Sequence, residues 1–145
     1  MSAMPENEFI EYSLDKYGGV SFPSLHDSNM SGIRISEKDR AVLYFSVNDA
    51  EAYDVWLNGL LLLKADNFRE GNTVLDMKIL SGNEQCYGLL AKLYEVDFEI
   101  EKLKPYFQKI IDQVSKNQLK IVQLNPSYGC EMLALCKEVK IFKSM

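Results

Sequence analysis

The sequence predicts an α+β protein in which an antiparallel, largely meandering β-sheet of about six or seven strands carries two helices packed on one face. In the first half of the chain, apolar and polar residues alternate with the period of two that is typical of half-buried strands. Further along, apolar residues recur every three or four positions, which indicates helices. A chain of 145 residues with 47% hydrophobic and 26% charged residues has the composition of an ordinary globular domain.

Two parts of unequal length are expected along the chain. Residues 1–24 contain Gly18, Gly19 and Pro23 and follow neither the helical nor the strand period, so they predict an irregular N-terminal arm. Residues 25–145 predict a single α+β domain.

The first predicted strands lie between residues 33 and 47. Alternation over 33–35 and 41–47, with the polar residues Glu37, Lys38 and Asp39 between the two runs, predicts an antiparallel pair.

Residues 53–57 continue this alternation and end at Asn58-Gly59, a dipeptide that favours a type I′ hairpin. Trp56 lies on the polar face of this strand, either under a helix or on an exposed patch, and a helix cover is favoured for a soluble monomer. The return strand Leu60–Ala65 begins with four leucines, so we expect it to lie centrally in the sheet with cover on both faces.

The remaining predicted elements follow in order. Residues 74–80 alternate, with Leu75, Met77 and Ile79 on one face. Helical spacing predicts a short helix that ends near Tyr94 and is capped by Asn83, and a second helix over about 103–116 with Pro105 in its first turn. The chain then predicts a strand over 119–124, a turn over 125–129 and a last strand over 131–142, although 131–138 also fits a helix.

Charge and composition argue against several classes of partner. The net charge of −5 disfavours nucleic acid, because its binding depends on basic residues that neutralise phosphates. Such a charge suits solubility and also steers a basic protein partner toward the surface. The longest apolar run is too short to span a membrane, and residues 1–12 resemble no secretory signal, so a cytoplasmic location is expected.

Motifs for cofactors, metals and hydrolytic chemistry are missing from the sequence. It contains neither a glycine-rich nucleotide loop nor a zinc-protease helix, and its three cysteines, Cys86, Cys130 and Cys136, form no C-x-x-C pair. No cofactor, no metal site and no catalytic residue is therefore predicted, and the cysteines fit buried apolar positions.

Two short stretches are the candidate binding residues. In Leu25-His26-Asp27-Ser28, His26 fits a general base beside a carboxylate, with Ser28 as a nearby hydroxyl. The favoured alternative is structural: Asp27 and Ser28 bond to local backbone and His26 fixes the arm on the sheet.

In Pro126-Ser127-Tyr128-Gly129, an exposed tyrosine on a rigid loop fits a binding tip. Alternatively, Pro126 and Gly129 set the turn and Tyr128 folds back on the core.

These two motifs, L-H-D-S and P-S-Y-G, together with the short strands between them, resemble those of small bacterial domains of unknown function, some of which are similar to immunity proteins. The resemblance spans residues 25–136. It implies an α+β protein of the cytoplasm that binds a partner and has no known catalytic residue set.

Three functional hypotheses follow. The first is a non-catalytic protein-binding module, in its concrete form an immunity protein that binds and neutralises a basic toxin. The second is a small-ligand binder or enzyme that uses His26 and Asp27. The third is a homo-oligomeric assembly subunit, and the sequence leaves the oligomeric state open.

Overall fold

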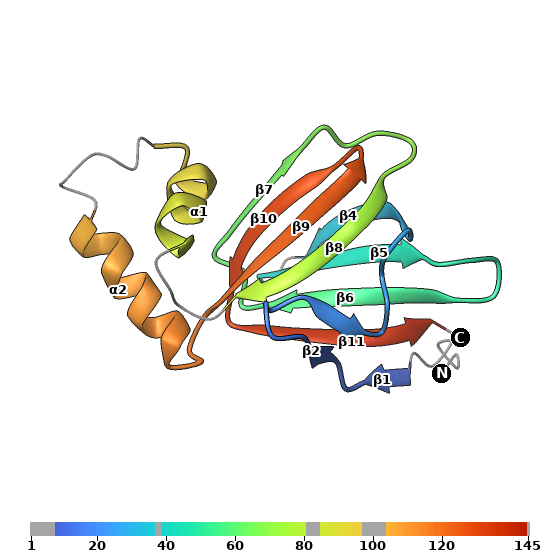
Figure 1. Cartoon of the computed structure of the whole chain (residues 1–145), viewed down its shortest axis with the longest axis horizontal. Coiled ribbons are helices and arrows are strands. Elements are labelled where there is room, and N and C mark those ends of the chain that lie inside the picture. Colours follow the sequence, from blue (N-terminus) through green and yellow to red (C-terminus); the bar gives the residue numbers. More distant parts are fainter. Residues whose placement is uncertain (1–7, 37–38, 81–84, 97–103, 145) are drawn as a thin grey trace.

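The computed structural model describes residues 8–36, 39–80, 85–96 and 104–144. Its main sheet has nine strands in the order β1-β11-β6-β5-β4-β8-β9-β10-β7, and a separate two-stranded sheet pairs β2 with β3 (Figure 1). All these pairs are antiparallel. The strands are β1 (Glu8–Ile10), β2 (Ser13–Leu14), β3 (Val20–Phe22), β4 (Asn29–Ser36), β5 (Arg40–Ser46), β6 (Ala52–Asn58), β7 (Leu62–Asp66), β8 (Thr73–Leu80), β9 (Lys120–Tyr128), β10 (Glu131–Cys136) and β11 (Glu138–Ser144).

The α+β class with an antiparallel sheet and two helices is confirmed, but the predicted number of six or seven strands was wrong. Three short strands lie within residues 8–22, where an irregular arm was expected, and β1 joins the main sheet beside β11. The predicted last strand over 131–142 is in fact two strands, because the chain turns at Lys137. Of the turn predicted over 37–39, residues 37 and 38 lie outside the described residues.

The main sheet folds into two leaves that face each other. The first leaf holds β1, β11, β6, β5 and β4, and the second holds β8, β9, β10 and β7. Strands β4 and β8 join the leaves through one register pair, Asn29 with Thr73. Because the two leaves pair at only this point, their apolar faces can close on each other.

Alternate residues of the strands fill the space between the leaves. This core buries side chains from both leaves, with Leu43, Phe45, Val55 and Leu57 on one side and Met77, Val122, Leu124 and Met132 on the other. The period-two pattern of the sequence is therefore the inward-facing set of each strand.

Both helices pack on the outer face of the second leaf (Figure 1). They are α1 (Gln85–Tyr94) and α2 (Lys104–Ser115), and α2 carries Pro105 in its first turn, as predicted. Their apolar stripes cover residues of β9 and β10 that point away from the main core, namely Ile121, Leu133 and Leu135. The predicted cap Asn83 lies outside the described residues. Neither helix within the described ranges has the length and apolar character needed to cross a membrane.

The Asn58-Gly59 hairpin prediction was wrong. Strand β6 pairs with β5 and β11, whereas β7 pairs with β10. Only Gly59 has a positive φ, of 64°, whereas a type I′ turn needs two such residues. Gly59 instead lets the chain step from the first leaf to the second beside Lys137, whose backbone N–H donates to the Asn58 carbonyl at 2.9 Å.

The leucine-rich strand β7 is an edge strand of the sheet, although a central position was predicted. It is nevertheless covered on both faces, because Leu62 packs against the helices and Leu63 packs against the main core. The pattern correctly predicted cover on two faces, but edge position depends on pairing partners that are far away in sequence.

The prediction that Leu75, Met77 and Ile79 share one face of β8 is correct only for Met77 and Ile79, which follow a bulge. The register between β8 and β9 shifts near Val74, so Val74 and Met77 are buried while Leu75 is exposed. Strand β9 continues through Pro126, which the bulge accommodates, and ends at Tyr128, so the turn predicted over 125–129 begins only after Tyr128.

Candidate functional site

The L-H-D-S motif is bonded to the first residues of β8. The backbone N–H of Asp27 donates to the Val74 carbonyl at 2.8 Å, and Val74 N–H donates to the Ser28 carbonyl at 2.9 Å. The His26 ring, through Nδ1, donates to the Leu75 carbonyl at 2.9 Å. The segment before β4 is therefore held on β8 along its length.

The P-S-Y-G motif lies on the other side of the same residues. Tyr128 is opposite Thr73 in the register, and Pro126 is opposite Val74. The Ser127 hydroxyl donates to the Thr73 carbonyl at 3.4 Å. The structure thus brings the two motifs together, one on each side of the start of β8, at the place where the leaves join.

Asn72 is the centre of this junction and was not singled out by the sequence analysis. Its side chain is buried, and Oδ1 accepts from the N–H groups of Arg69 at 2.9 Å and Cys130 at 3.0 Å. Its Nδ2 donates to the carbonyls of Met30 at 3.0 Å and Arg69 at 2.8 Å. Its backbone N–H donates to Asn29 Oδ1 at 2.8 Å. A single amide therefore ties β4, the loop before β8 and the start of β10 together.

Gly129 is required next to this amide. Its φ is +91°, and a Cβ placed there would lie 2.6 Å from Asn72 Oδ1 and 2.9 Å from the Gly71 carbonyl oxygen. The glycine of the motif therefore serves the packing of the junction.

The structure places His26 next to Asp27 but separates both from the Ser28 hydroxyl. His26 Nε2 is 3.5 Å from Asp27 Oδ2, and both side chains are largely exposed. Ser28 is fully buried, and its hydroxyl donates to the Leu25 carbonyl at 2.6 Å. A general base needs a reacting group within hydrogen-bond reach, and Ser28 is already engaged elsewhere. The contacts of Ser28 and His26 agree with the structural alternative, whereas the Asp27 carboxylate lies beside His26 and not on local backbone.

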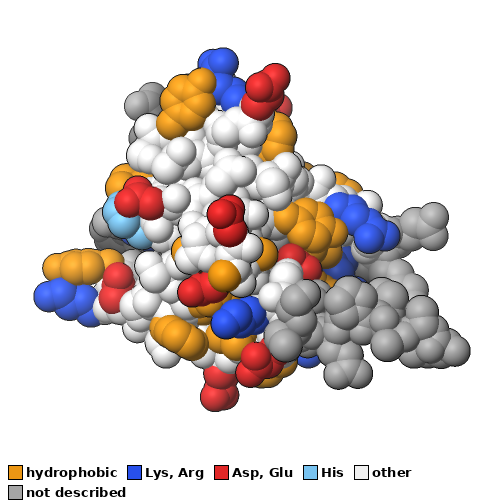
Figure 2. Space-filling model, turned by 90° about the vertical axis from the view of Figure 1, so that its right-hand side faces the viewer, with side chains coloured by type: hydrophobic (Ala, Val, Ile, Leu, Met, Phe, Trp, Pro, Cys, Tyr) orange, Lys and Arg blue, Asp and Glu red, His pale blue; other side chains and the backbone are white. Residues whose placement is uncertain are grey.

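One end of the molecule gathers the segment before β4 and the loops that connect neighbouring elements within each leaf, and we call it the loop end: residues 26–29, 46–52, 66–73 and 128–131. Figure 2 views this end and shows carboxylates spread across it. Exposed aromatic side chains lie here too, because Tyr128 is 59% exposed and Phe68 is 48% exposed. The Arg69 guanidinium lies 6.0 Å from the centre of the Tyr128 ring.

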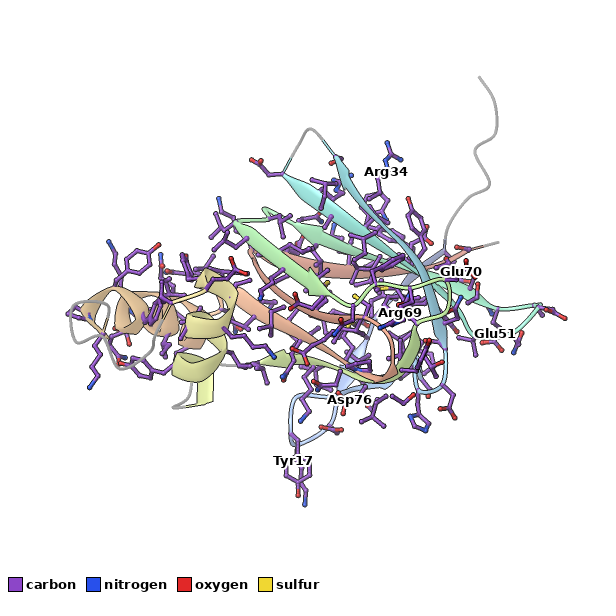
Figure 3. All side chains as sticks on the ribbon, turned by 90° about the horizontal axis from the view of Figure 1, so that it is seen from above. Tyr17, Arg34, Glu51, Arg69, Glu70 and Asp76 are labelled. Carbon is purple, nitrogen blue, oxygen red and sulfur yellow. The ribbon has the colours of Figure 1, made fainter. Side chains whose placement is uncertain are left out.

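Several carboxylates of the loop end have no lysine or arginine within ion-pair distance in the described part of the chain. They are Asp27, Asp49, Glu51 and Glu70. Figure 3 shows Glu51 and Glu70 at this end beside Arg69, whereas Tyr17 projects from the body elsewhere. Of the residues predicted for binding, His26, Asp27, Ser127 and Tyr128 are exposed at this end, whereas Ser28 is buried.

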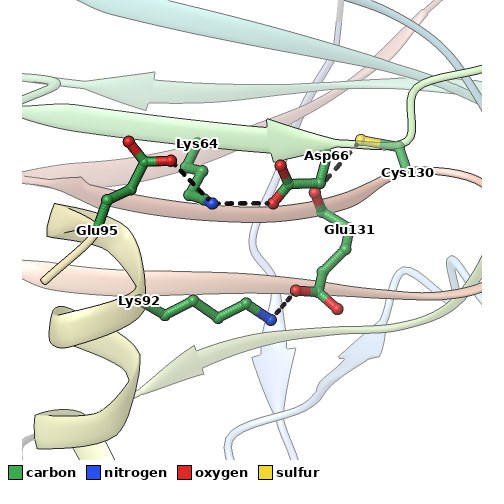
Figure 4. Close-up of polar contacts among 6 residues, drawn as sticks. All are labelled: Lys64, Asp66, Lys92, Glu95, Cys130 and Glu131. Atoms are coloured by element: carbon green, nitrogen blue, oxygen red, sulfur yellow. Dashed lines mark hydrogen bonds and ion pairs between the residues drawn. The ribbon is translucent and has the colours of Figure 1, made fainter. Parts of the chain in front are cut away.

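Two further carboxylates at this end are neutralised by lysines (Figure 4). Lys64 Nζ lies 3.4 Å from Asp66 and 3.2 Å from Glu95, and Lys92 pairs with Glu131. The hydrogen bond to Glu95 is the main cause that raises the pKa of Lys64 above its ordinary value. Because Lys92 and Glu95 come from α1 and the segment after it, these pairs hold the helix on the second leaf.

A groove on the outer face of the first leaf was not predicted. It has a volume of about 320 Å³ and is lined by Arg34, Ser36, Arg40, Val42, Tyr44, Asp54 and Trp56. Trp56 was expected under a helix, and that expectation was wrong because both helices pack on the other leaf. The available signal was the alternation itself, which puts these residues on the polar face of three successive strands.

The described residues contain no group of three or more His, Cys, Asp or Glu side chains placed to hold a metal ion. Cys86, Cys130 and Cys136 are free thiols and all are buried, as predicted from their apolar neighbours. Burial raises the pKa of Cys136 to about 12, so this thiol is protonated at neutral pH.

The comparisons with known proteins add no family to this picture. Protein-family models, curated sequences and solved structures all gave no match to the chain.

Proposed function

We propose that this chain is a cytoplasmic, non-catalytic protein-binding module that engages a basic partner protein through its loop end. The observation that carries the proposal is the combination, at one end of the sheet, of exposed Tyr128 and Phe68 with carboxylates that pair with no lysine or arginine in the described part of the chain. Exposed aromatic residues supply most of the binding energy at protein interfaces, and surrounding charges select the partner and speed its approach.

The rigidity of the loop end favours binding further. Tyr128 ends β9 directly before the junction held by Asn72 and Gly129, so its backbone is fixed before a partner arrives. A pre-ordered contact residue loses little conformational entropy on binding. The resemblance of the two motifs to immunity-like proteins gives the concrete form of the proposal, a protein that binds and neutralises a basic toxin.

The experiment is affinity capture from the source cells, with the tagged protein as bait and mass spectrometry of what remains bound. We expect one basic protein in equal amount, and we expect Tyr128→Ala to reduce its capture at least about tenfold. Tyr17→Ala is the matched control, because Tyr17 is 69% exposed and lies away from the loop end. An equal loss with both variants, or no stoichiometric partner, contradicts the proposal.

A further inference from the structure

The groove on the outer face of the first leaf carries two arginines, Arg34 and Arg40. Among the residues that the structure describes, neither Arg34 nor Arg40 lies within ion-pair distance of an aspartate or glutamate. Arg34 is opposite Val42 in the register, and Arg40 is two residues before Val42 on the same face. Positions related in this way are diagonal neighbours on a sheet, about 7–8 Å apart, so two like charges stand close together.

The guanidinium of Arg40 is held in place before any ligand binds. Its Nε donates to Asn58 Oδ1 at 2.6 Å, and its central carbon lies 4.2 Å from the centre of the Trp56 ring. Asn58 is oriented in turn, because its Nδ2 donates to Glu138 at 3.1 Å. Among the described residues, no other side chain hydrogen-bonds or forms an ion pair with this guanidinium, and its planar fork suits a carboxylate.

The surface beside the groove is largely aromatic, and its one lysine in the register opposite Trp56, Lys140, lies 3.9 Å from Glu138. Trp56 contacts Phe142, with ring centres 4.6 Å apart, and Phe142 contacts Phe9 at 5.8 Å. Phe9 is 56% exposed, so this aromatic row is open to solvent. Asp54 lines the groove between the row and Tyr44. A ligand that covers the row and the groove must therefore combine apolar groups with a separate negative charge.

We propose that this face binds an extended peptide segment of a partner protein, with an acidic side chain of the peptide held between Arg34 and Arg40. The apolar side chains of that segment lie along Trp56, Phe142 and Phe9. Charge complementarity selects the occupant: Asp54 lines the same groove and disfavours a polyanion such as nucleic acid, whereas one carboxylate meets two guanidinium groups. This site is separate from the loop end and does not depend on the function proposed for it.

The test uses the emission of Trp56, the one tryptophan of the chain. The probe is a capped peptide of alternating glutamate and leucine, and its control is the same peptide with glutamine in place of glutamate. We expect saturable change of Trp56 emission with the acidic peptide, at least about tenfold weaker binding of the glutamine peptide, and weaker binding at high salt.

Variants of the full chain locate the binding. Arg34 is exposed and forms no ion pair within the described ranges, so Arg34→Gln is expected to keep the fold and to weaken peptide binding about tenfold or more. Lys78→Gln, on the other leaf, removes the same charge and is expected to bind as the parent does. Because Arg40→Gln alters the surroundings of Trp56, its binding is followed by the anisotropy of a labelled peptide, with the same tenfold loss expected.

Three results overturn the proposal. The first is an absence of any emission or anisotropy change at millimolar peptide, and the second is equal binding of Arg34→Gln and Lys78→Gln. The third is displacement of the peptide by inorganic phosphate or by duplex DNA at equal or lower concentration, because the groove would then select a free anion or a nucleic acid. Binding that needs both glutamate and Arg34, and resists phosphate, supports it.

Discussion

Replacement of Asn72 by alanine probes the junction on which both sequence motifs converge. The substitution removes four side-chain hydrogen bonds, two of them to backbone groups of Arg69 in a partly exposed loop. Water can replace those two. The Met30 carbonyl and the Cys130 N–H are buried, so they lose their partner without replacement.

The expected cost follows from these two buried groups. Each buried group left without a partner costs about 1–3 kcal/mol, so Asn72→Ala is expected to lower the free energy of unfolding by about 4 kcal/mol. For a chain of this size, that loss lowers Tm by about 10 °C. It is a large part of the total stability of a typical domain, which is about 5–15 kcal/mol.

The measurement is urea unfolding followed by circular dichroism, with Asn48→Ala as the matched control. Asn48 Oδ1 accepts from the N–H groups of Ala50 and Glu51 in an exposed hairpin, so water replaces its bonds and a loss below about 1 kcal/mol is expected. Equal losses for the two variants, with an unchanged denaturant slope, would refute the assignment of Asn72 as the centre of the junction.

Two further predictions concern the same core. Gly129→Ala combines a positive φ with a Cβ that meets Asn72 Oδ1, so we expect thermal melting to report a loss of at least about 2 kcal/mol, whereas Gly71→Ala, with open space around its Cβ, is expected to lose less; the reverse order would contradict the packing argument. The pKa of Cys136 is raised from 9.0 to about 12, so the unfolded state loses its proton first as the pH rises above 9. Stability is therefore expected to fall by about 1.4 kcal/mol between pH 8 and pH 10 on this account, and Cys136→Ala to remove that part of the slope; an unchanged slope would contradict the burial argument.

The strand pattern of the sequence was sufficient to predict the class of fold. Alternation follows from local geometry, and so does the position of Pro105 at the start of α2, because each depends on neighbours a few residues away. The strand order was not predictable in this way. Asn58-Gly59 satisfies the local preference of a hairpin, but the structure uses Gly59 as a corner between two leaves. That choice depends on β11, which lies about 80 residues further along the chain.

The candidate site shows the same limit. The two motifs were noticed because their residue types are unusual in sequence, and the structure bonds both to the start of β8. Asn72 was not singled out, because nothing in the sequence shows that its amide meets groups 42 and 58 residues away. Trp56 and Arg40 come from different strands, so their contact required the register.

Amide hydrogen exchange of the captured complex tests the central claim most directly, because it reports which backbone segments a partner covers. We predict slower exchange on binding in the loops 47–51, 66–72 and 128–131, with residues 15–19 and α2 unchanged. Protection confined to α2 or to residues 15–19 would contradict a partner surface at the loop end.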